Sequence, residues 1–296
     1  MYITQHAKVS TLSRQLVIQT NYDTLQVPIE DIQLLMFGTP QIVITGAAVA
    51  ALAEVKAKII YTGMGGQVVA ETVGLHNGSR TQQTISQQVQ WPASRIANAW
   101  TRIVDAKLAN QAQVLVYHDV PSASVEEQRE MLELNDPTNR EAVAARKYFP
   151  LLFGKTFSRS DLCATNAALN YGYAILLAEF NREIVANGYL PEWGIHHHSN
   201  ENPFNLGSDF MEPFRPIIDH WVASQKIKEL TPDIKIGLVT LLDIELNFNN
   251  QQTILRNAVA DLVASCIRYL NQATNELTIK VVVPSEVSSH ALNDHV

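Results

Sequence analysis

Three short segments of this chain carry the side chains best suited to chemistry. The first holds Glu141, which follows Asn139 and Arg140 at the expected start of a helix. Ala144 and Ala145 share one helix face with Glu141, and small residues one turn after a carboxylate leave room for an ion or a ligand backbone. A glutamate stabilised by the helix dipole would give the same pattern, and from this segment alone that interpretation is favoured.

The second segment is a run of three histidines, His196, His197 and His198, which follows Gly194 and Ile195. On an extended backbone, neighbouring side chains alternate in direction, so the three imidazoles cannot all face one metal ion. The run lies inside the chain, which excludes an expression tag. Imidazole is a common transition-metal ligand, but the run by itself identifies no partner ligand.

The third segment, Asn205 to Pro216, contains Asp209 and Glu212 at the spacing of a helix capping box. Capping alone explains Asp209 well. Pro213 is tolerated in a first helical turn, whereas Pro216 removes a helical hydrogen bond and crowds a carbonyl one turn earlier. A short helix with two prolines beside a carboxylate indicates fixed geometry, although a packing kink would look the same.

These segments lie in a mainly helical part of the chain, which short strands precede. The predicted fold class is α+β, with a small N-terminal β-domain over residues 1–75, a linker over 76–90 and a larger, mostly α-helical domain over 91–296. The linker is predicted from a polar stretch that contains Asn77-Gly78. Strand-prone runs occur at 7–12, 15–20, 25–29, 41–45 and 58–62. Helical patterns occur at 92–111, 125–134, 138–153, 161–187, 209–224 and 253–271, with a closing strand at 277–283.

The composition is that of an ordinary globular protein, with 46% hydrophobic and 17% charged residues. The cysteines, Cys163 and Cys266, are isolated, which fits a reducing compartment and excludes a disulfide framework or a CxxC metal site. The N-terminus lacks the apolar core of a signal peptide. The uncharged stretch from Leu34 to Ala53 is interrupted by Gly38-Thr39-Pro40-Gln41, which predicts a strand, a turn and a short helix rather than a membrane span.

The net charge of -7 counts against a protein that binds nucleic acid alone. Residues 1–80 hold equal numbers of basic and acidic side chains, so the acidic excess lies in residues 81–296. Within 140–159, however, Glu141 is the single acid among five cations. A lone carboxylate in such a segment suits a metal ligand beside a phosphate track, but on charge alone a solvated helix face is favoured.

The motifs together carry a resemblance that none carries alone. In order and spacing, three motifs closely resemble the CRISPR-associated endonuclease Cas one, the integrase subunit of spacer acquisition, in its type II form: DPTNREAVAARKYF, NAALNYGYAILL and GIHHHSNENPFNLGSDFMEPFRP. The resemblance covers about residues 7 to 225. That family often has an aromatic residue where Glu201 stands, a departure that concerns DNA contacts and not the metal ligands.

In that family a glutamate, a histidine and an acidic residue bind one divalent cation. The resemblance places these ligands, which are also the catalytic residues, at Glu141, His197 and Glu212, and it gives Asp209 a secondary role near the metal. It implies Mg²⁺ or Mn²⁺, which agrees with two carboxylates and one imidazole that leave coordination positions open. The basic residues near these ligands are candidates for holding DNA phosphates: Arg140, Arg146, Lys147 and Arg215.

The resemblance also implies a reaction and its partners. The family inserts a new spacer into a CRISPR array when the 3′-hydroxyl of incoming double-stranded DNA attacks a phosphodiester of the leader–repeat DNA, so no protein nucleophile is needed. Residues 1–75 are expected to form a homodimer and residues 91–296 to hold the site. Two such dimers would flank a dimer of the small partner Cas two, in the prokaryotic cytoplasm and away from any membrane.

From the residues alone, two alternatives to this function stay open. One is a metal-dependent nuclease of unrelated role, which would share the ligands but cut DNA without integrating it. The other is a non-catalytic helical scaffold, in which the same histidines and acids are caps and surface groups.

Overall fold

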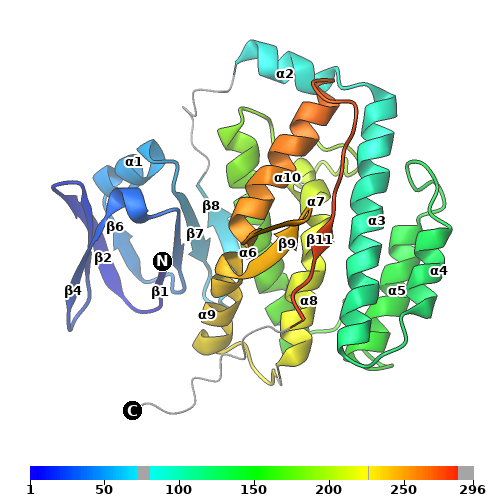
Figure 1. Ribbon diagram of the computed structural model, residues 1–296. Coiled ribbons are helices and arrows are strands. Elements are labelled where there is room, and N and C mark those ends of the chain that lie inside the picture. The colour runs from blue at the N-terminus through cyan, green and yellow to red at the C-terminus, as the bar shows by residue number, and fades with distance from the viewer. Residues whose placement is uncertain (73–80, 226, 286–296) are drawn as a thin grey trace. The chain divides into compact units, whose positions relative to one another are not determined.

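The computed structural model describes residues 1–72, 81–225 and 227–285. The chain divides into two compact units, Met1–Ser79 and Arg80–Val296. Short strands build the first unit and helices build most of the second, which confirms the predicted α+β fold class (Figure 1). Among these described residues, no helix is long and apolar enough to cross a lipid bilayer.

Two four-stranded sheets form the first unit. One has the order β4-β3-β2-β6, from strands Thr24–Pro28, Gln15–Gln19, Ala7–Leu12 and Ile42–Ile44. The other has the order β1-β5-β7-β8, from strands Tyr2–Ile3, Leu34–Phe37, Lys58–Thr62 and Val68–Glu71. Helix α1 (Gly46–Glu54) and the 3-10 turn η1 (Ile29–Asp31) complete this unit.

Local sequence explains the hairpin that begins the first sheet. Ser13 and Arg14 both have positive φ, 48° and 63°, which gives the two-residue turn that matches the twist of paired strands. This turn fixes the register in which Leu12 pairs with Gln15. Alternation along the strands then places one face in a core shared with α1, lined by Ala7, Val9, Leu16, Ile18, Leu35, Phe37, Ala48, Leu52 and Ile59.

Helices make up most of the second unit. In chain order they are α2 (Gln82–Val89), α3 (Ala93–Tyr117), α4 (Ala123–Glu130), α5 (Arg140–Phe153), α6 (Ala164–Ala186), α7 (Asn205–Met211), α8 (Arg215–Ser224), α9 (Pro232–Thr240) and α10 (Leu255–Leu270). Short 3-10 turns lie at η2 (Glu212–Phe214) and η3 (Leu241–Asp243). A small sheet of order β10-β9-β11 is formed by Gln251–Ile254, Glu245–Phe248 and Val281–Val282.

Two long helices organise this unit. Helix α6 is apolar on most of its sides, and it accordingly packs against α7, α8, α9 and α10 (Figure 1). Helix α3 packs against α4, α5, α8 and η2. Trp100 of α3 and Trp221 of α8 are both fully buried within the unit. The segments that carry the predicted ligands therefore meet at α3.

The structure differs from the prediction of a linker over 76–90. Residues 76–80, with Asn77-Gly78, lie outside the described residues, but residues 82–89 form α2. Thr81 and Thr84 make a reciprocal capping box, with distances of 3.2 Å and 2.9 Å between backbone nitrogen and side-chain oxygen. Gln88 is buried and donates to the carbonyls of Leu190 and Trp193. A polar helix anchored by side-chain hydrogen bonds leaves little hydrophobic periodicity for a sequence to reveal.

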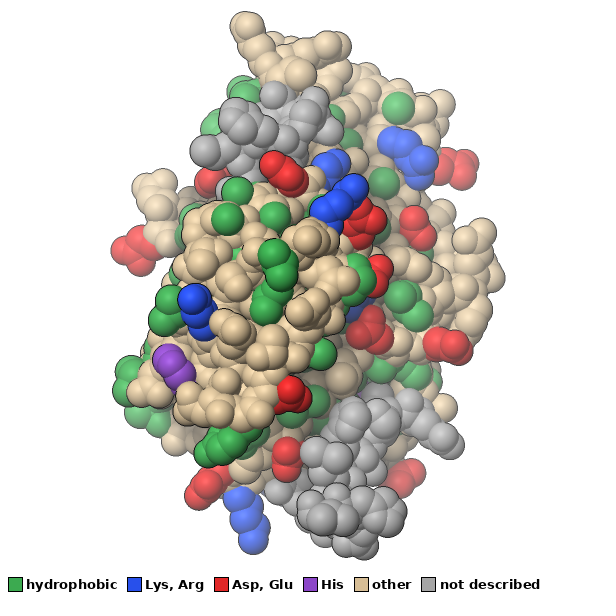
Figure 2. Space-filling view, turned by 90° about the vertical axis from the view of Figure 1, so that its left-hand side faces the viewer, with side chains coloured by type: hydrophobic (Ala, Val, Ile, Leu, Met, Phe, Trp, Pro, Cys, Tyr) green, Lys and Arg blue, Asp and Glu red, His purple; other side chains and the backbone are tan. Residues whose placement is uncertain are grey.

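Basic side chains do not form a continuous track on the face shown in Figure 2. The Lys and Arg side chains coloured there stand singly and are interspersed with Asp and Glu side chains.

Gly172 provides a test of how closely α6 and α8 pack. A Cβ atom at Gly172 would lie 2.5 Å from Ile218 Cγ2 and 3.1 Å from Leu238 Cδ2. Overpacking of this kind costs about 1–3 kcal/mol, whereas alanine gains about 1 kcal/mol over glycine within a helix. We therefore expect Gly172→Ala to lower the free energy of unfolding, as measured by urea denaturation.

The matched control is Gly46→Ala, at the first residue of α1. A Cβ atom there meets nothing within 4 Å, so we expect this variant to be as stable as the unaltered protein or slightly more stable. If Gly172→Ala unfolds at the same urea concentration as Gly46→Ala, α6 and α8 do not pack as closely at Gly172 as the structure indicates.

Candidate metal centre

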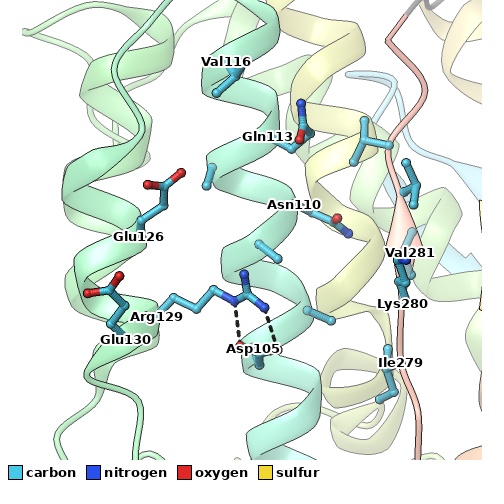
Figure 3. A pocket seen from close by; sticks show the side chains of 15 residues that line it. Asp105, Asn110, Gln113, Val116, Glu126, Arg129, Glu130, Ile279, Lys280 and Val281 are labelled. Carbon is cyan, nitrogen blue, oxygen red and sulfur yellow. Dashed lines mark hydrogen bonds and ion pairs between the residues drawn. The ribbon is translucent and has the colours of Figure 1, made fainter.

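Opposite faces of α3 meet different surroundings. Asp105 faces a hollow between α3, α4 and segment 279–283, where its carboxylate pairs with Arg129 at 2.7 Å (Figure 3). None of the predicted ligands lines this hollow. Lys107 lies two residues further along, and two residues correspond to about half a helical turn. It therefore points away from the hollow and toward the predicted ligands.

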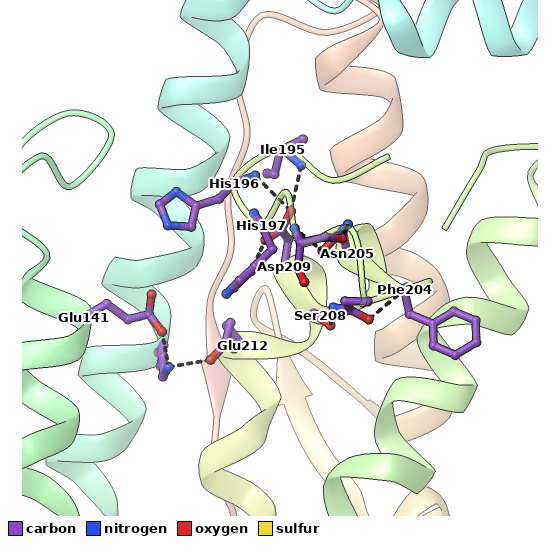
Figure 4. A network of polar contacts seen from close by, with 12 residues as sticks. Glu141, Ile195, His196, His197, Phe204, Asn205, Ser208, Asp209 and Glu212 are labelled. Carbon is purple, nitrogen blue, oxygen red and sulfur yellow. Dashed lines mark hydrogen bonds and ion pairs between the residues drawn. The ribbon is translucent and has the colours of Figure 1, made fainter. Parts of the chain in front are cut away.

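A buried aspartate organises the histidine segment (Figure 4). Asp209 of α7 is fully buried, and its Oδ2 accepts hydrogen bonds from the backbone N–H groups of Ile195 at 2.7 Å and His196 at 3.0 Å. Its Oδ1 accepts from the backbone N–H of His197 at 3.1 Å. Hydrogen bonds to an ionised acceptor are stronger than neutral ones. One carboxylate therefore fixes the path of three successive residues.

The same carboxylate also orients the predicted ligand His197. The Nδ1 atom of His197 lies 2.6 Å from Asp209 Oδ1, so the pairing assigns the proton to Nδ1 and leaves Nε2 as the atom able to bind a metal. This hydrogen bond raises the pKa of His197, against the opposing effect of burial. Asp209, predicted as a secondary residue near the metal, is thus engaged by four donors in the histidine segment.

Gly194 allows the segment to close around this aspartate. A Cβ atom at Gly194 would lie 2.5 Å from the His197 carbonyl oxygen and 2.7 Å from Asp209 Oδ2, closer than real Cβ contacts. Only glycine fits this position without a shift of the loop. In the sequence this residue marked only the start of the motif, because its role depends on a contact fifteen residues away.

Glu141 is positioned by a capped helix start. The buried carboxylate of Asp136 accepts from the backbone N–H groups of Arg140 at 2.6 Å and Glu141 at 3.0 Å, and the Asn139 side chain accepts from Ala142 at 3.3 Å. These groups satisfy the free donors of the first turn of α5. The Glu141 side chain is therefore not needed to cap the helix, and it points toward α3.

Glu212 stands at the break between two helices. We expected one helix over 209–224, but Pro213 and Pro216 divide it into α7, η2 and α8, since each proline lacks a backbone donor. Burial alone would raise the pKa of Glu212, yet the charges of Arg215 and Lys107 outweigh burial and lower it to about 2. Arg215 Nη1 lies 2.8 Å from Glu212 Oε1. Glu212 is therefore an ionised, nearly inaccessible carboxylate.

Lys107 joins the two predicted carboxylate ligands and was missed in the sequence. Its Nζ atom lies 2.6 Å from Glu141 Oε1 and 2.5 Å from Glu212 Oε2. The signal was present, because Lys107 follows Trp100 by seven residues and Ile103 by four, which places a cation on the buried face of α3. We call Glu141, His197, Asp209, Glu212, Lys107 and Arg215 together the candidate centre.

The remaining histidines point to other neighbours. The His196 ring stacks on the buried Trp100, with ring centroids 3.9 Å apart and planes within 6°. Burial lowers the pKa of His196. His198 is exposed and lines a separate shallow pocket with Trp193 and Glu201. Of the three imidazoles, His197 is the one that Asp209 directs toward the side where Glu141 and Glu212 lie (Figure 4).

Of the four predicted phosphate contacts, Arg215 is the one that touches a candidate ligand. Lys147 pairs with Glu127 of α4 at 3.1 Å, and Arg146 is exposed on α5. Arg140 donates to the uncharged side chains of Thr138 and Gln128. Arg140 and Lys147 therefore contact residues of α4, and Arg146 donates to the backbone of α5, so none of these three contacts is with a candidate ligand.

The donor set suits a hard divalent cation. Within residues 1–72, 81–225 and 227–285, no three His, Cys, Asp or Glu side chains are grouped closely enough to hold an ion as they stand. The Lys107 ammonium, however, already lies between two carboxylates, so this is a place where a cation is stabilised. Two carboxylates beside an oriented imidazole are donors that suit such a cation, provided that the ammonium moves away.

Sequence comparison identifies relatives over most of the chain. Residues 1–233 match the family described as CRISPR associated protein Cas1. A protein of Neisseria meningitidis serogroup C, named CRISPR-associated endonuclease Cas1, is 34% identical over 272 residues, which are 90% of this chain and 90% of that protein.

Two solved structures share the fold at low sequence identity. A casposase bound to integration product has a TM-score of 0.76 at 15% identity, over 92% of this chain and 90% of that chain. A chain of a Cas6-RT-Cas1–Cas2 complex has a TM-score of 0.72 at 15% identity, over 95% of this chain and 36% of that chain. The family match and the Neisseria relative show that this chain belongs to the Cas1 family of CRISPR-associated endonucleases, as the sequence motifs predicted.

Proposed function

We propose that this chain is a divalent-metal-dependent DNA integrase and endonuclease that inserts new spacers into a CRISPR array. One observation carries the proposal: Glu141 and Glu212 both contact one cation, the Lys107 ammonium, beside an imidazole that Asp209 orients. Membership of the Cas1 family supports the same activity. The reaction class is transesterification, in which a DNA 3′-hydroxyl attacks a phosphodiester, with hydrolysis as the related side reaction.

The proposed cofactor is Mg²⁺ or Mn²⁺, held by Glu141, His197 Nε2 and Glu212. When bound, such an ion activates the attacking oxygen and stabilises charge on the phosphate. The protein's own part is to hold these donors rigidly. Asp209 fixes the imidazole, the capped start of α5 fixes Glu141, and Arg215 fixes Glu212. Arg215 also places a guanidinium at the centre that can meet a DNA phosphate.

The proposed partners are double-stranded DNA, a second copy of this chain and a small partner, Cas two. The DNA comprises the incoming spacer precursor and the leader–repeat junction, and the reaction is placed in the prokaryotic cytoplasm. We assign homodimer formation to the β-rich unit. An acidic chain that shares DNA binding with a partner accounts for the net charge of -7 better than one that binds DNA alone.

The first functional prediction concerns the three ligands. Glu141→Ala, His197→Ala and Glu212→Ala are each expected to lower strand transfer by about a hundredfold or more, because metal-ion catalysis supplies several kcal/mol of transition-state stabilisation. The measurement is integration of labelled DNA into a leader–repeat substrate, with the small partner and Mn²⁺ present.

Two further variants make this result interpretable. Glu212→Gln keeps the shape of a buried side chain that Lys107 and Arg215 contact. If this variant folds but is inactive, the loss of activity comes from the missing carboxylate ligand and not from unfolding. Glu130→Ala removes an exposed acid of α4 and should retain full activity. Near-normal strand transfer by any folded variant of the three would remove that residue from the ligand set.

The second prediction separates the neighbouring histidines. His197→Ala is expected to be inactive, while His196→Ala and His198→Ala should keep much of the activity, because Asp209 orients only the His197 ring. His196→Ala loses the stacking contact with Trp100, so its melting temperature should fall although integration continues. The assignment by spacing would be wrong if His196→Ala were as inactive as His197→Ala.

The third prediction concerns charge. The isolated chain should bind duplex DNA weakly at physiological salt, with a shallow salt dependence, and the small partner should strengthen binding and steepen that dependence. Each phosphate contact adds roughly -0.9 to the slope of log affinity against log salt. Binding isotherms at several salt concentrations measure this slope. Arg146→Ala and Lys147→Ala should weaken binding equally across DNA sequences, since phosphate contacts carry no base information.

A clear result would contradict this prediction. Tight binding with a steep salt dependence by the isolated chain would mean that its fold gathers a basic surface on a face other than that in Figure 2.

A further inference from the structure

A buried lysine lies between the two carboxylates of the candidate centre. The Lys107 side chain is 6% exposed, and its Nζ contacts both Glu141 and Glu212, at 2.6 Å and 2.5 Å. The dashed lines that leave these two residues in Figure 4 mark the ion pairs. Arg215 contacts Glu212 through the other carboxylate oxygen. The protein itself therefore supplies counter-cations to both carboxylates.

We propose that Lys107 is a resident counter-cation of the candidate centre. It is a positioning residue that holds Glu141 and Glu212 together without metal, and its positive charge keeps the affinity for a divalent ion low until a DNA phosphate arrives. The inference rests on the proposed metal-dependent function. It adds that one side chain, Lys107, controls how tightly the candidate centre binds a metal ion.

The charge balance of the candidate centre supports this role. With the histidine neutral, its three carboxylates and two cations give a formal charge of -1, which a divalent ion changes to +1. Without Lys107, the same ion would bring the centre from -2 to neutrality. An ammonium and a divalent ion a few ångströms apart in a partly buried site repel each other strongly. Metal entry is therefore opposed by a charge that the protein supplies.

The same geometry couples metal binding to DNA binding. For an ion to bind between the carboxylates, the Lys107 ammonium would have to leave that position, while its long side chain would stay anchored on α3 beside them. A DNA phosphate offers the displaced ammonium a new anionic partner and removes the positive excess. Because coupling between two ligands is reciprocal, DNA should tighten metal binding and metal should tighten DNA binding.

The test is a calorimetric Mn²⁺ titration of the DNA-free protein, with melting temperature as a second readout. Lys107→Met keeps the length of the side chain without its charge, and it is expected to bind Mn²⁺ at least about tenfold more tightly than the unaltered protein. Its metal-free form should melt at a lower temperature, since two buried carboxylates lose their counter-cation. Mn²⁺ should then raise its melting temperature more than that of the unaltered protein.

Two other variants at the same position sharpen the test. Lys107→Arg retains the charge and should retain weak metal binding. Lys107→Gln retains a hydrogen-bond donor without the charge, so it should behave like Lys107→Met, and it replaces that variant if Lys107→Met does not fold. Duplex DNA should tighten Mn²⁺ binding several-fold in the unaltered protein and much less in Lys107→Gln.

Lys58→Met is the matched control. Lys58 is equally buried and pairs with Glu71 at 3.1 Å in the β-rich unit, so its loss should lower stability and leave Mn²⁺ affinity unchanged. Equal or weaker Mn²⁺ binding by folded Lys107→Met or Lys107→Gln overturns the role of Lys107 while leaving the proposed function intact. If no form of the protein binds Mn²⁺, with or without DNA, both the inference and the metal-dependent function are wrong.

Discussion

The candidate centre depends on one buried carboxylate. Asp209 is fully shielded from water, so its charge has to be satisfied by protein donors, and three successive backbone N–H groups and the His197 imidazole supply them. This requirement explains why Gly194 must lack a side chain. It also explains how a histidine on a loop can have a fixed direction, which loops rarely provide. The arrangement makes α7 the support for a segment that has no regular structure of its own.

A second constraint is the balance of charge around Glu212. This carboxylate is buried where α7 ends, and the two prolines that interrupt the helix place it at a 3-10 turn rather than in a regular helix. Lys107 and Arg215 then contact its two oxygens. Breaking a buried ion pair leaves an uncompensated charge, so each partner depends on the others. Structure and proposed activity thus share the same few contacts.

The sequence revealed those features that local chemistry determines. A helix was predicted over 138–153, and α5 begins within that range at Arg140, because the side chains that cap it are neighbours in the chain. The α+β fold class followed from the change in hydrophobic period. Lys107 was missed because its partners lie 34 and 105 residues away in sequence. Helix α2 was missed because Gln88, and not an apolar stripe, holds it in place. The family motifs brought together ligands that no local pattern connects.

The most direct test of the account is a crystal structure of the protein with Mn²⁺ and DNA, in which anomalous scattering locates the ion. The account predicts one Mn²⁺ bound by Glu141, His197 Nε2 and Glu212, with Asp209 still accepting from His197 Nδ1 and the Lys107 ammonium displaced from between the carboxylates. An ion bound directly by Asp209, or an ion elsewhere with Lys107 still joining Glu141 and Glu212, would contradict it.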